Sequence, residues 1–84
     1  MADIRIQMPL GGVLTPGYQL KKVLNVVVEL EDGEWMVIDQ TFGQDVIGTT
    51  QEETVAAYRK LLVEHYKKVR DEFEKLKVYI EATE

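Results

Sequence analysis

The sequence predicts an α+β fold in which a small antiparallel β-sheet packs on one long C-terminal α-helix. Two observations carry this prediction. Apolar and polar residues alternate over 21–39 around Asp32-Gly33, and an apolar stripe at 3–4 residue spacing follows Thr50. Eighty-four residues make one domain, 1–84. We expect an N-terminal strand and loop (1–19), a β-hairpin with an edge strand (20–48) and the helix (50–80).

The N-terminal segment begins with alternation. Residues 3–8 place apolar and polar side chains in turn, as a half-buried strand or an ordered tail would. Residues 9–17 contain two Pro and three Gly, so we expect a loop there. Its apolar residues Leu10, Val13 and Leu14 indicate that this loop lies against the rest of the domain.

A β-hairpin is predicted next, with strands over 21–30 and 34–39. Asp32-Gly33 is a strong turn signal, because Gly adopts the positive φ that a primed turn requires. In the second strand Trp35 and Val37 share one face, and Met36 and Ile38 share the other. The apolar pair at 46–47 is compatible with a third, edge strand.

Residues 50–80 read as one helix. Thr50 and Glu53 match a capping box, and no Pro or Gly follows Thr50 to force a break. The first half has a wide apolar face that can cover a sheet. That face consists of Val55, Ala56, Ala57, Tyr58, Leu61, Leu62, Val63 and Tyr66. Residues 77–83 also alternate, so a short strand at this end is an open alternative.

The second half of this helix carries a narrower stripe, which predicts self-association. A helix of about thirty residues is roughly 45 Å long, so it would overhang a domain of this size. Apolar residues at this spacing are typical of a helix–helix seam, and a C2 homodimer is the commonest solution. The alternative is that the N-terminal segment folds back over the stripe. The predicted interface consists of Val69, Phe73, Leu76 and Ile80.

The net charge of −5 is unevenly distributed, because no basic residue lies between Lys22 and Arg59. An acidic surface repels phosphate and attracts basic proteins. We therefore predict a partner-binding surface with Trp35 as its buried anchor. A solvated face that only keeps the protein in solution is the alternative. The predicted surface consists of Glu29, Glu31, Asp32, Glu34, Trp35, Asp39 and Asp45.

The residue types present argue against catalysis. Cys and Ser are absent, which excludes disulfides, thiolate metal sites and the common nucleophile triads. His65 is the only histidine, and it has no second ligand at helical spacing. Asp39 and Asp45 flank a Gly-containing loop and form the one candidate carboxylate pair. We expect no enzymatic activity, no cofactor and no metal.

Three further expectations concern location and ligands. The aromatic residues of the sheet region are not interleaved with basic residues, so we expect no direct nucleic-acid binding. The first residues do not resemble a signal peptide, and no apolar run is long enough to span a membrane. These features favour a cytoplasmic protein.

One stretch resembles a known family. The run VVVELEDGEWMVI (26–38), Gly43 and the run GTTQEET (48–54) are similar to the N-terminal domain of HicB-type antitoxins, over about residues 23–66. That family has a strand, an acidic-Gly hairpin, a second strand, a Gly-bearing turn, a short strand and a Gly-x-Thr-x-Glu-Glu-like helix cap. Gly48, Thr50, Glu52 and Glu53 match this cap.

The sequence also departs from the family. It lacks the Pro-containing segment after the second strand, and a leading strand and a Gly/Pro loop precede the matched region. No ribbon-helix-helix or helix-turn-helix domain follows, so operator binding is not expected. The resemblance implies a small acidic module that binds a basic, RNA-cleaving partner.

Two functions follow from these patterns. The first is a non-catalytic protein-binding module, antitoxin-like or inhibitor-like, whose acidic face binds and masks a basic nucleic-acid-acting protein such as a ribonuclease toxin. The second is a structural or assembly subunit that self-associates through its C-terminal helix. The exposure of Trp35 and the clustering of the acids on one face distinguish them.

Overall fold

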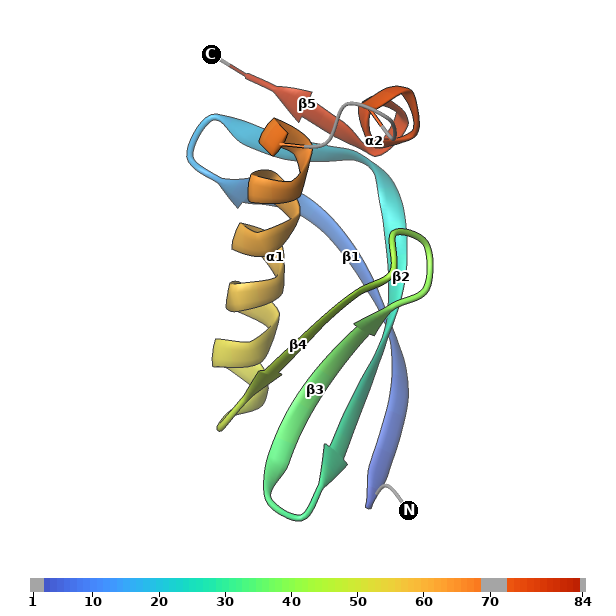
Figure 1. Cartoon of the computed structure of the whole chain (residues 1–84), viewed down its shortest axis with the longest axis vertical. Helices are drawn as coiled ribbons and strands as arrows, with labels where there is room; N and C mark the ends of the chain where they lie inside the picture. The colour runs from blue at the N-terminus through green and yellow to red at the C-terminus, as the bar shows by residue number, and fades with distance from the viewer. Residues whose placement is uncertain (1–2, 69–72, 84) are drawn as a thin grey trace.

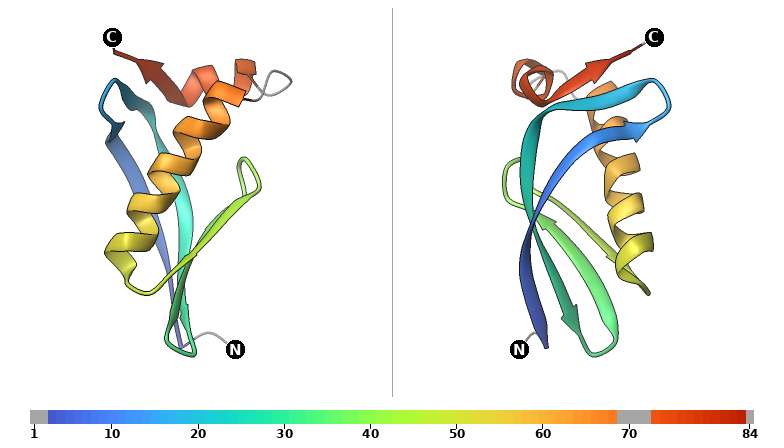
Figure 2. Two further views of the ribbon diagram at one scale, coloured as in Figure 1. Left: turned by 60° about the vertical axis from the view of Figure 1, so that its left-hand side comes forward. Right: turned by 180° about the vertical axis from the view of Figure 1, so that it is seen from behind.

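The computed structural model describes residues 3–68 and 73–83. Its elements are β1 (Ile4–Thr15), β2 (Tyr18–Glu31), β3 (Glu34–Asp39), β4 (Gln44–Gly48), α1 (Gln51–Lys68), α2 (Phe73–Tyr79) and β5 (Ile80–Ala82). The first four strands form an antiparallel meander in the order β1-β2-β3-β4, and β5 pairs with β2 (Figure 1). Helix α1 crosses one face of the twisted sheet (Figure 2). The α+β class and the antiparallel sheet are therefore confirmed.

The long β1–β2 hairpin corrects the predicted loop at 9–17. Strand β1 continues through Pro9, which lies opposite Asn25, and ends only at Thr15. Because β1 is at the end of the strand order, a proline there need not break a ladder hydrogen bond. The register shifts between Leu10 and Gly12, where Gly12 has a φ of 75°. An edge strand with a bulge therefore accommodates residues that the sequence pattern assigns to a loop.

The β2–β3 hairpin matches its prediction. Asp32 has a φ of 50° and Gly33 a φ of 80°, so both turn residues are left-handed, as a type I′ turn requires. Strand β3 has the predicted bounds, and β4 is the expected third strand of this part of the sheet. Strand β2 is longer than predicted. Its second half pairs with β3, and its first half pairs with β5.

The core lies between the inner face of the sheet and the helices. Even-numbered residues of β2 from Leu24 onward lie on the inner face, and Val26 and Val28 are buried as the alternation predicts. From α1, Tyr58 and Leu62 are fully buried against them, whereas the two alanines of the predicted face, 56 and 57, are exposed. The other buried apolar residues are Leu10, Leu14, Leu20, Leu24, Val37, Phe42, Val63, Leu76 and Ile80.

The prediction of one helix over 50–80 is wrong. Helix α1 ends at Lys68, α2 begins at Phe73, and the chain becomes strand β5 at Ile80 (Figure 1). The alternative of a strand at this end is confirmed for Ile80–Ala82, where Ile80 lies opposite Leu20. A straight helix would leave the second stripe in water, whereas the shorter α2 and β5 bury part of it against β2.

The predicted helix–helix interface is corrected by the same geometry. Leu76 is 0% exposed and Ile80 is 1% exposed, and both lie in the core of the single chain. Neither side chain is available to a second copy. Val69 and the side chain of Phe73 lie outside the described part of the chain. The stripe therefore no longer supports dimerisation through the C-terminal helix.

The start of α1 shows a modified capping box. The backbone N–H of Glu53 donates to Thr50 Oγ1 at 3.1 Å, as predicted. The carboxylate of Glu53 accepts instead from Thr49 Oγ1, at 2.7 Å, and does not return to the backbone of Thr50 in the way a full capping box would. Gly48 precedes this cap, and an added Cβ there would overlap the hydroxyl of Thr54. The β4–α1 junction therefore requires glycine for space.

Candidate functional site

The cross-strand register gathers most of the predicted acids on one face of the sheet. Glu29 lies opposite Met36, Glu31 opposite Glu34, and Ile38 opposite Asp45. These pairs alternate with buried pairs such as Val28 and Val37, so they point to the other side of the sheet, away from α1. We call this surface the acidic outer face and define it as Val27, Glu29, Glu31, Glu34, Met36, Ile38, Asp45 and Ile47.

Apolar residues occupy the middle of the acidic outer face. Val27, Met36 and Ile38 are half-buried, and Ile47 is 60% exposed. Glu31 and Glu34 stand toward the hairpin end of this apolar strip, and Asp45 stands at its β4 edge. Near the hairpin the surface is hollowed by a depression of about 180 Å³, lined by Glu29, Glu31, Asp32, Glu34 and Met36. The arrangement is an apolar centre with acids around it.

Arg5 and Glu34 both lie directly beside acids of this face. Glu29 forms an ion pair with Arg5 of β1, at 2.9 Å between Nη1 and Oε1. The Arg5 side chain is 62% exposed, so this pair contributes little to stability. Glu31 and Glu34 are directly opposite one another, and like charges in such a cross-strand position are destabilising.

Asp39 does not belong to this surface. It is 1% exposed on the inner side of β3, where Oδ2 accepts from the hydroxyl of Tyr58 at 2.6 Å. Its Oδ1 accepts from the backbone N–H of Thr41 at 2.8 Å and from that of Phe42 at 3.3 Å. Burial and the hydrogen bond to Asp39 hold the pKa of Tyr58 well above its ordinary value. Asp39 therefore joins the β3–β4 turn to α1.

The same geometry removes the candidate carboxylate pair. Asp45 lies opposite Ile38 on the outer face, whereas Asp39 lies on the inner face. The two carboxylates are thus on different sides of the sheet and do not share a reaction site. Within residues 3–68 and 73–83, no three metal-ligating side chains of the His, Cys, Asp or Glu type come together.

Trp35 also points away from the acids. It lies opposite Leu30 and Gly48 on the inner face, half-buried against the core. It cannot serve as the anchor of the acidic outer face, a role that Met36, Ile38 and Ile47 are placed to take. The alternation in the sequence already predicted this, because Glu34 and Met36 are two residues apart and share one face of the strand, whereas Trp35 lies on the other face.

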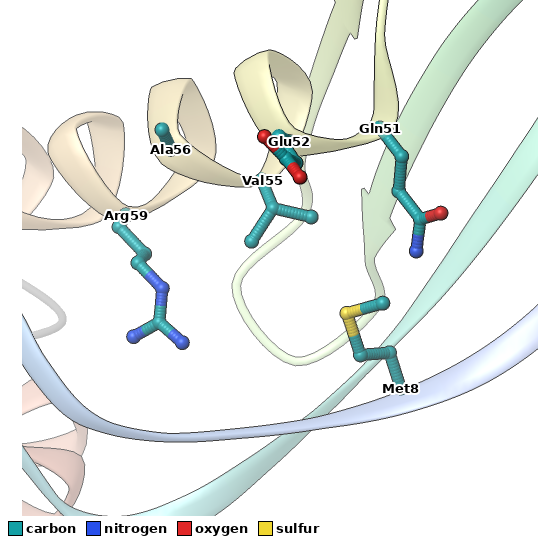
Figure 3. A pocket seen from close by; sticks show the side chains of 6 residues that line it. All are labelled: Met8, Gln51, Glu52, Val55, Ala56 and Arg59. Carbon is teal, nitrogen blue, oxygen red and sulfur yellow. The ribbon is translucent and has the colours of Figure 1, made fainter.

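A second surface feature is an apolar groove between β1 and the first half of α1. Figure 3 shows Met8 rising from β1 toward Val55 and Gln51. The groove measures about 350 Å³ and is lined by Met8, Gln51, Glu52, Val55, Ala56 and Arg59. Sequence reasoning missed it, because the groove depends on β1 lying beside α1, and no local pattern reports a contact between segments so far apart in the sequence.

Three lysines lie over aromatic rings around α2. Lys22 Nζ is 5.1 Å from the ring centre of Tyr79, and Lys67 Nζ is 5.1 Å from that of Tyr18. Lys75 Nζ is 5.3 Å from the centre of Phe42. Each ammonium group covers one face of its ring at cation–π distance, so that face is not open for stacking by a base.

Comparison with protein-family models gives no match, and comparisons with curated proteins and with solved structures give no significant match. The resemblance to HicB-type antitoxins therefore stays a prediction. Among the described residues, no helix is both long and apolar enough to cross a membrane.

Proposed function

We propose that this protein is a non-catalytic protein-binding module, inhibitor-like or antitoxin-like, whose acidic outer face binds and masks a basic protein that acts on nucleic acid. One observation carries the proposal. The register of β2, β3 and β4 brings Glu29, Glu31, Glu34 and Asp45 to one side of the sheet, around an apolar strip. Sequence order alone does not require this, because Asp39 and Trp35 lie on the opposite side.

The two components of the face have different roles in binding. Charges around an interface mainly accelerate encounter and select partners of opposite charge. The apolar strip of Met36, Ile38 and Ile47 supplies the area that a partner removes from water. Because these residues lie on paired strands, little ordering is needed before a partner binds.

The charge of the face indicates the class of partner. Carboxylates repel the phosphate backbone, so a nucleic acid is not the expected ligand. A protein that itself binds polyanions carries the complementary basic surface. Occupying that surface would block access of nucleic acid to it, and masking of this kind requires no catalytic group in the present chain.

Self-association through the C-terminal helix is not retained as the alternative function. It depended on four exposed apolar side chains, and two of them, Leu76 and Ile80, are covered by the chain itself.

The proposal is tested by charge reversal on the face with a matched control elsewhere. The face variant is Glu31→Lys with Glu34→Lys. The control is Glu64→Lys with Glu74→Lys, which changes the net charge equally at exposed positions of the two helices. Wild type and both variants are immobilised and used to capture proteins from the cells of origin. A captured protein is identified, purified and assayed on its own nucleic acid with increasing amounts of each variant.

We expect wild type and control to capture the same basic protein and to inhibit it, and the face variant to do neither. Raising the salt concentration should weaken binding, because exposed charges are screened over about 10 Å at 0.1 M. Equal capture by all three proteins, or a captured protein whose activity is unchanged by wild type, would refute the proposal.

A further inference from the structure

The free edge of β1 is blocked in its second half and open in its first. In the described sheet β1 pairs only with β2, so its other side is an edge. Arg59 of α1 reaches this edge and donates from Nη1 to the carbonyl oxygens of Gly11, at 3.0 Å, and Val13, at 3.2 Å. Such side-chain cover is one way that proteins prevent strand addition. The Arg59 contacts end at Gly11, so they do not cover the edge over 4–8.

The open half of β1 also exposes apolar side chains. Ile4 is 42% exposed and Ile6 is 41% exposed, both on the inner face, where they lie opposite Leu30 and Val28. Met8 follows on the same face and lines the groove beside Val55. A strand added here would meet the apolar side chains of Ile4 and Ile6, followed by Met8 at the groove.

The backbone polarity of this edge can be inferred from Pro9. Proline has no N–H and is tolerated in a sheet where its nitrogen points away from the neighbouring strand. Arg5 and Gln7 are four and two residues before Pro9, so they direct their backbone N–H and C=O groups to the same outward side. Ile4, Ile6 and Met8 then form the backbone hydrogen bonds to β2. The edge therefore presents two outward donor–acceptor residues separated by one apolar residue.

We propose that this edge pairs with β1 of a second copy, antiparallel, about a twofold axis at Ile6. Arg5 then lies opposite Gln7 of the second copy, and each of these pairs exchanges both backbone hydrogen bonds. Ile6 faces Ile6 of the second copy, and Ile4 faces Met8 at the mouth of the groove. The two sheets become one, with the acidic outer faces on the same side.

This register is the one that the side chains favour. Moving the axis to Arg5 would place two arginines directly opposite, which is destabilising. Moving it to Gln7 would place Arg5 opposite Pro9, which has no N–H to donate. With the axis at Ile6, the apolar residues within 4–8 meet apolar residues, Pro9 lies beyond the paired segment, and no like charges are opposed. The contact is small, so we expect a concentration-dependent dimer, not an obligate one.

The dimer and the binding of a basic partner respond oppositely to salt. Each chain carries a net charge of −5, so two copies repel one another and salt should favour their association. Binding of a cationic partner should weaken as the salt concentration rises. The inference does not depend on the proposed function, and failure of one leaves the other testable.

The first experiment uses sedimentation equilibrium over a concentration series at low and high salt. Wild type should move from the 9.7 kDa of one chain toward twice that mass as its concentration rises. Gln7→Pro should remain at the mass of one chain, because it removes an outward N–H without breaking the β1–β2 ladder. Gln7→Ala keeps that N–H and should associate like wild type. A wild type that stays at 9.7 kDa throughout, or a folded Gln7→Pro that dimerises normally, would overturn the proposal.

The second experiment tests the register and does not depend on how Gln7→Pro folds. The chain has no cysteine, so Ile6→Cys introduces a single thiol, which the proposed axis places opposite its copy at disulfide distance. Val13→Cys is the control, at the half of β1 that Arg59 covers. Val13 is more exposed, at 64%, so random collision would oxidise it faster. We expect the reverse order, and faster cross-linking at Val13 would exclude this interface.

Discussion

The hydroxyl of Tyr58 donates a 2.6 Å hydrogen bond to Oδ2 of Asp39, and both side chains are almost completely buried. Tyr58 lies in the middle of α1 and Asp39 ends β3. The other oxygen of Asp39 accepts from the backbone of the turn that follows. One carboxylate thus holds the β3–β4 turn and the helix together, which is why this acid is unavailable to a partner.

Removing the Tyr58 hydroxyl should destabilise the fold. Tyr58→Phe keeps the ring and leaves Asp39 Oδ2 without its donor, which should lower the free energy of unfolding by about 1–3 kcal/mol. Tyr18→Phe is the control, because the half-buried ring of Tyr18 packs on Tyr66. This variant should lower the free energy of unfolding by less than about 0.5 kcal/mol. Urea denaturation measures both variants. A Tyr58→Phe protein as stable as wild type would mean that this bond contributes nothing net.

The same residue should make the fold sensitive to alkaline pH. Burial and the bond to Asp39 raise the pKa of Tyr58 above its unfolded value of 10.0, so the folded chain holds the proton more tightly. The resulting stabilisation is complete below pH 10 and is lost as pH rises, by up to about 1.4 kcal/mol per unit. Denaturation curves recorded at increasing pH should show the advantage of wild type over Tyr58→Phe shrinking above pH 10. An advantage that stays constant there would contradict the assignment.

Leu76 should contribute to the stability of the single chain. It is 0% exposed in α2, so Leu76→Ala should reduce the free energy of unfolding by about 2–5 kcal/mol. Val78→Ala, in the same helix at a side chain that is 53% exposed, should cost much less. Thermal denaturation combined with sedimentation separates stability from association. If Leu76→Ala were as stable as wild type but no longer dimerised, Leu76 would lie in a helix–helix interface, as the sequence analysis predicted.

Gly48 should not tolerate a side chain. A Cβ at this position would overlap the hydroxyl of Thr54 and come within 3.3 Å of its Cα, so Gly48→Ala should destabilise the protein by about 1–3 kcal/mol. Gly11→Ala is the control, because nothing lies within 4 Å of the corresponding Cβ. Combining Gly48→Ala with Thr54→Ala should cost less than the sum of the two changes. Strict additivity in this cycle would show that the two side chains do not interfere.

Local signals were sufficient for much of the fold. Asp32-Gly33 predicted the turn because glycine and aspartate tolerate the positive φ that a primed turn needs, and both residues adopt it. Thr50 predicted the start of α1, since its hydroxyl can accept an otherwise unpaired N–H of the first turn. Alternation predicted β3 with its observed bounds. Each of these depends on residues only a few positions apart.

Other features depended on neighbours distant in sequence. Pro9 and the glycines near it are typical of a loop, yet an edge position and a bulge allow them in β1. Nothing within 50–80 breaks a helix, yet the chain gains burial for Leu76 and Ile80 by turning back onto β2. Local propensity cannot report that gain, because the partner surface lies about 60 residues earlier.

The sequence by itself determined the α+β class, the β2–β3 hairpin, the start of α1 and an excess of acids between Lys22 and Arg59. Only the tertiary structure decided which of those acids form a surface. Helix α1 covers one face of the sheet, and Asp39 and Trp35 lie on that face. Glu31, Glu34 and Asp45 lie on the opposite face, which the helix leaves exposed. The physical reason is that alternation assigns residues to two faces, but only packing determines which of these faces the helix covers.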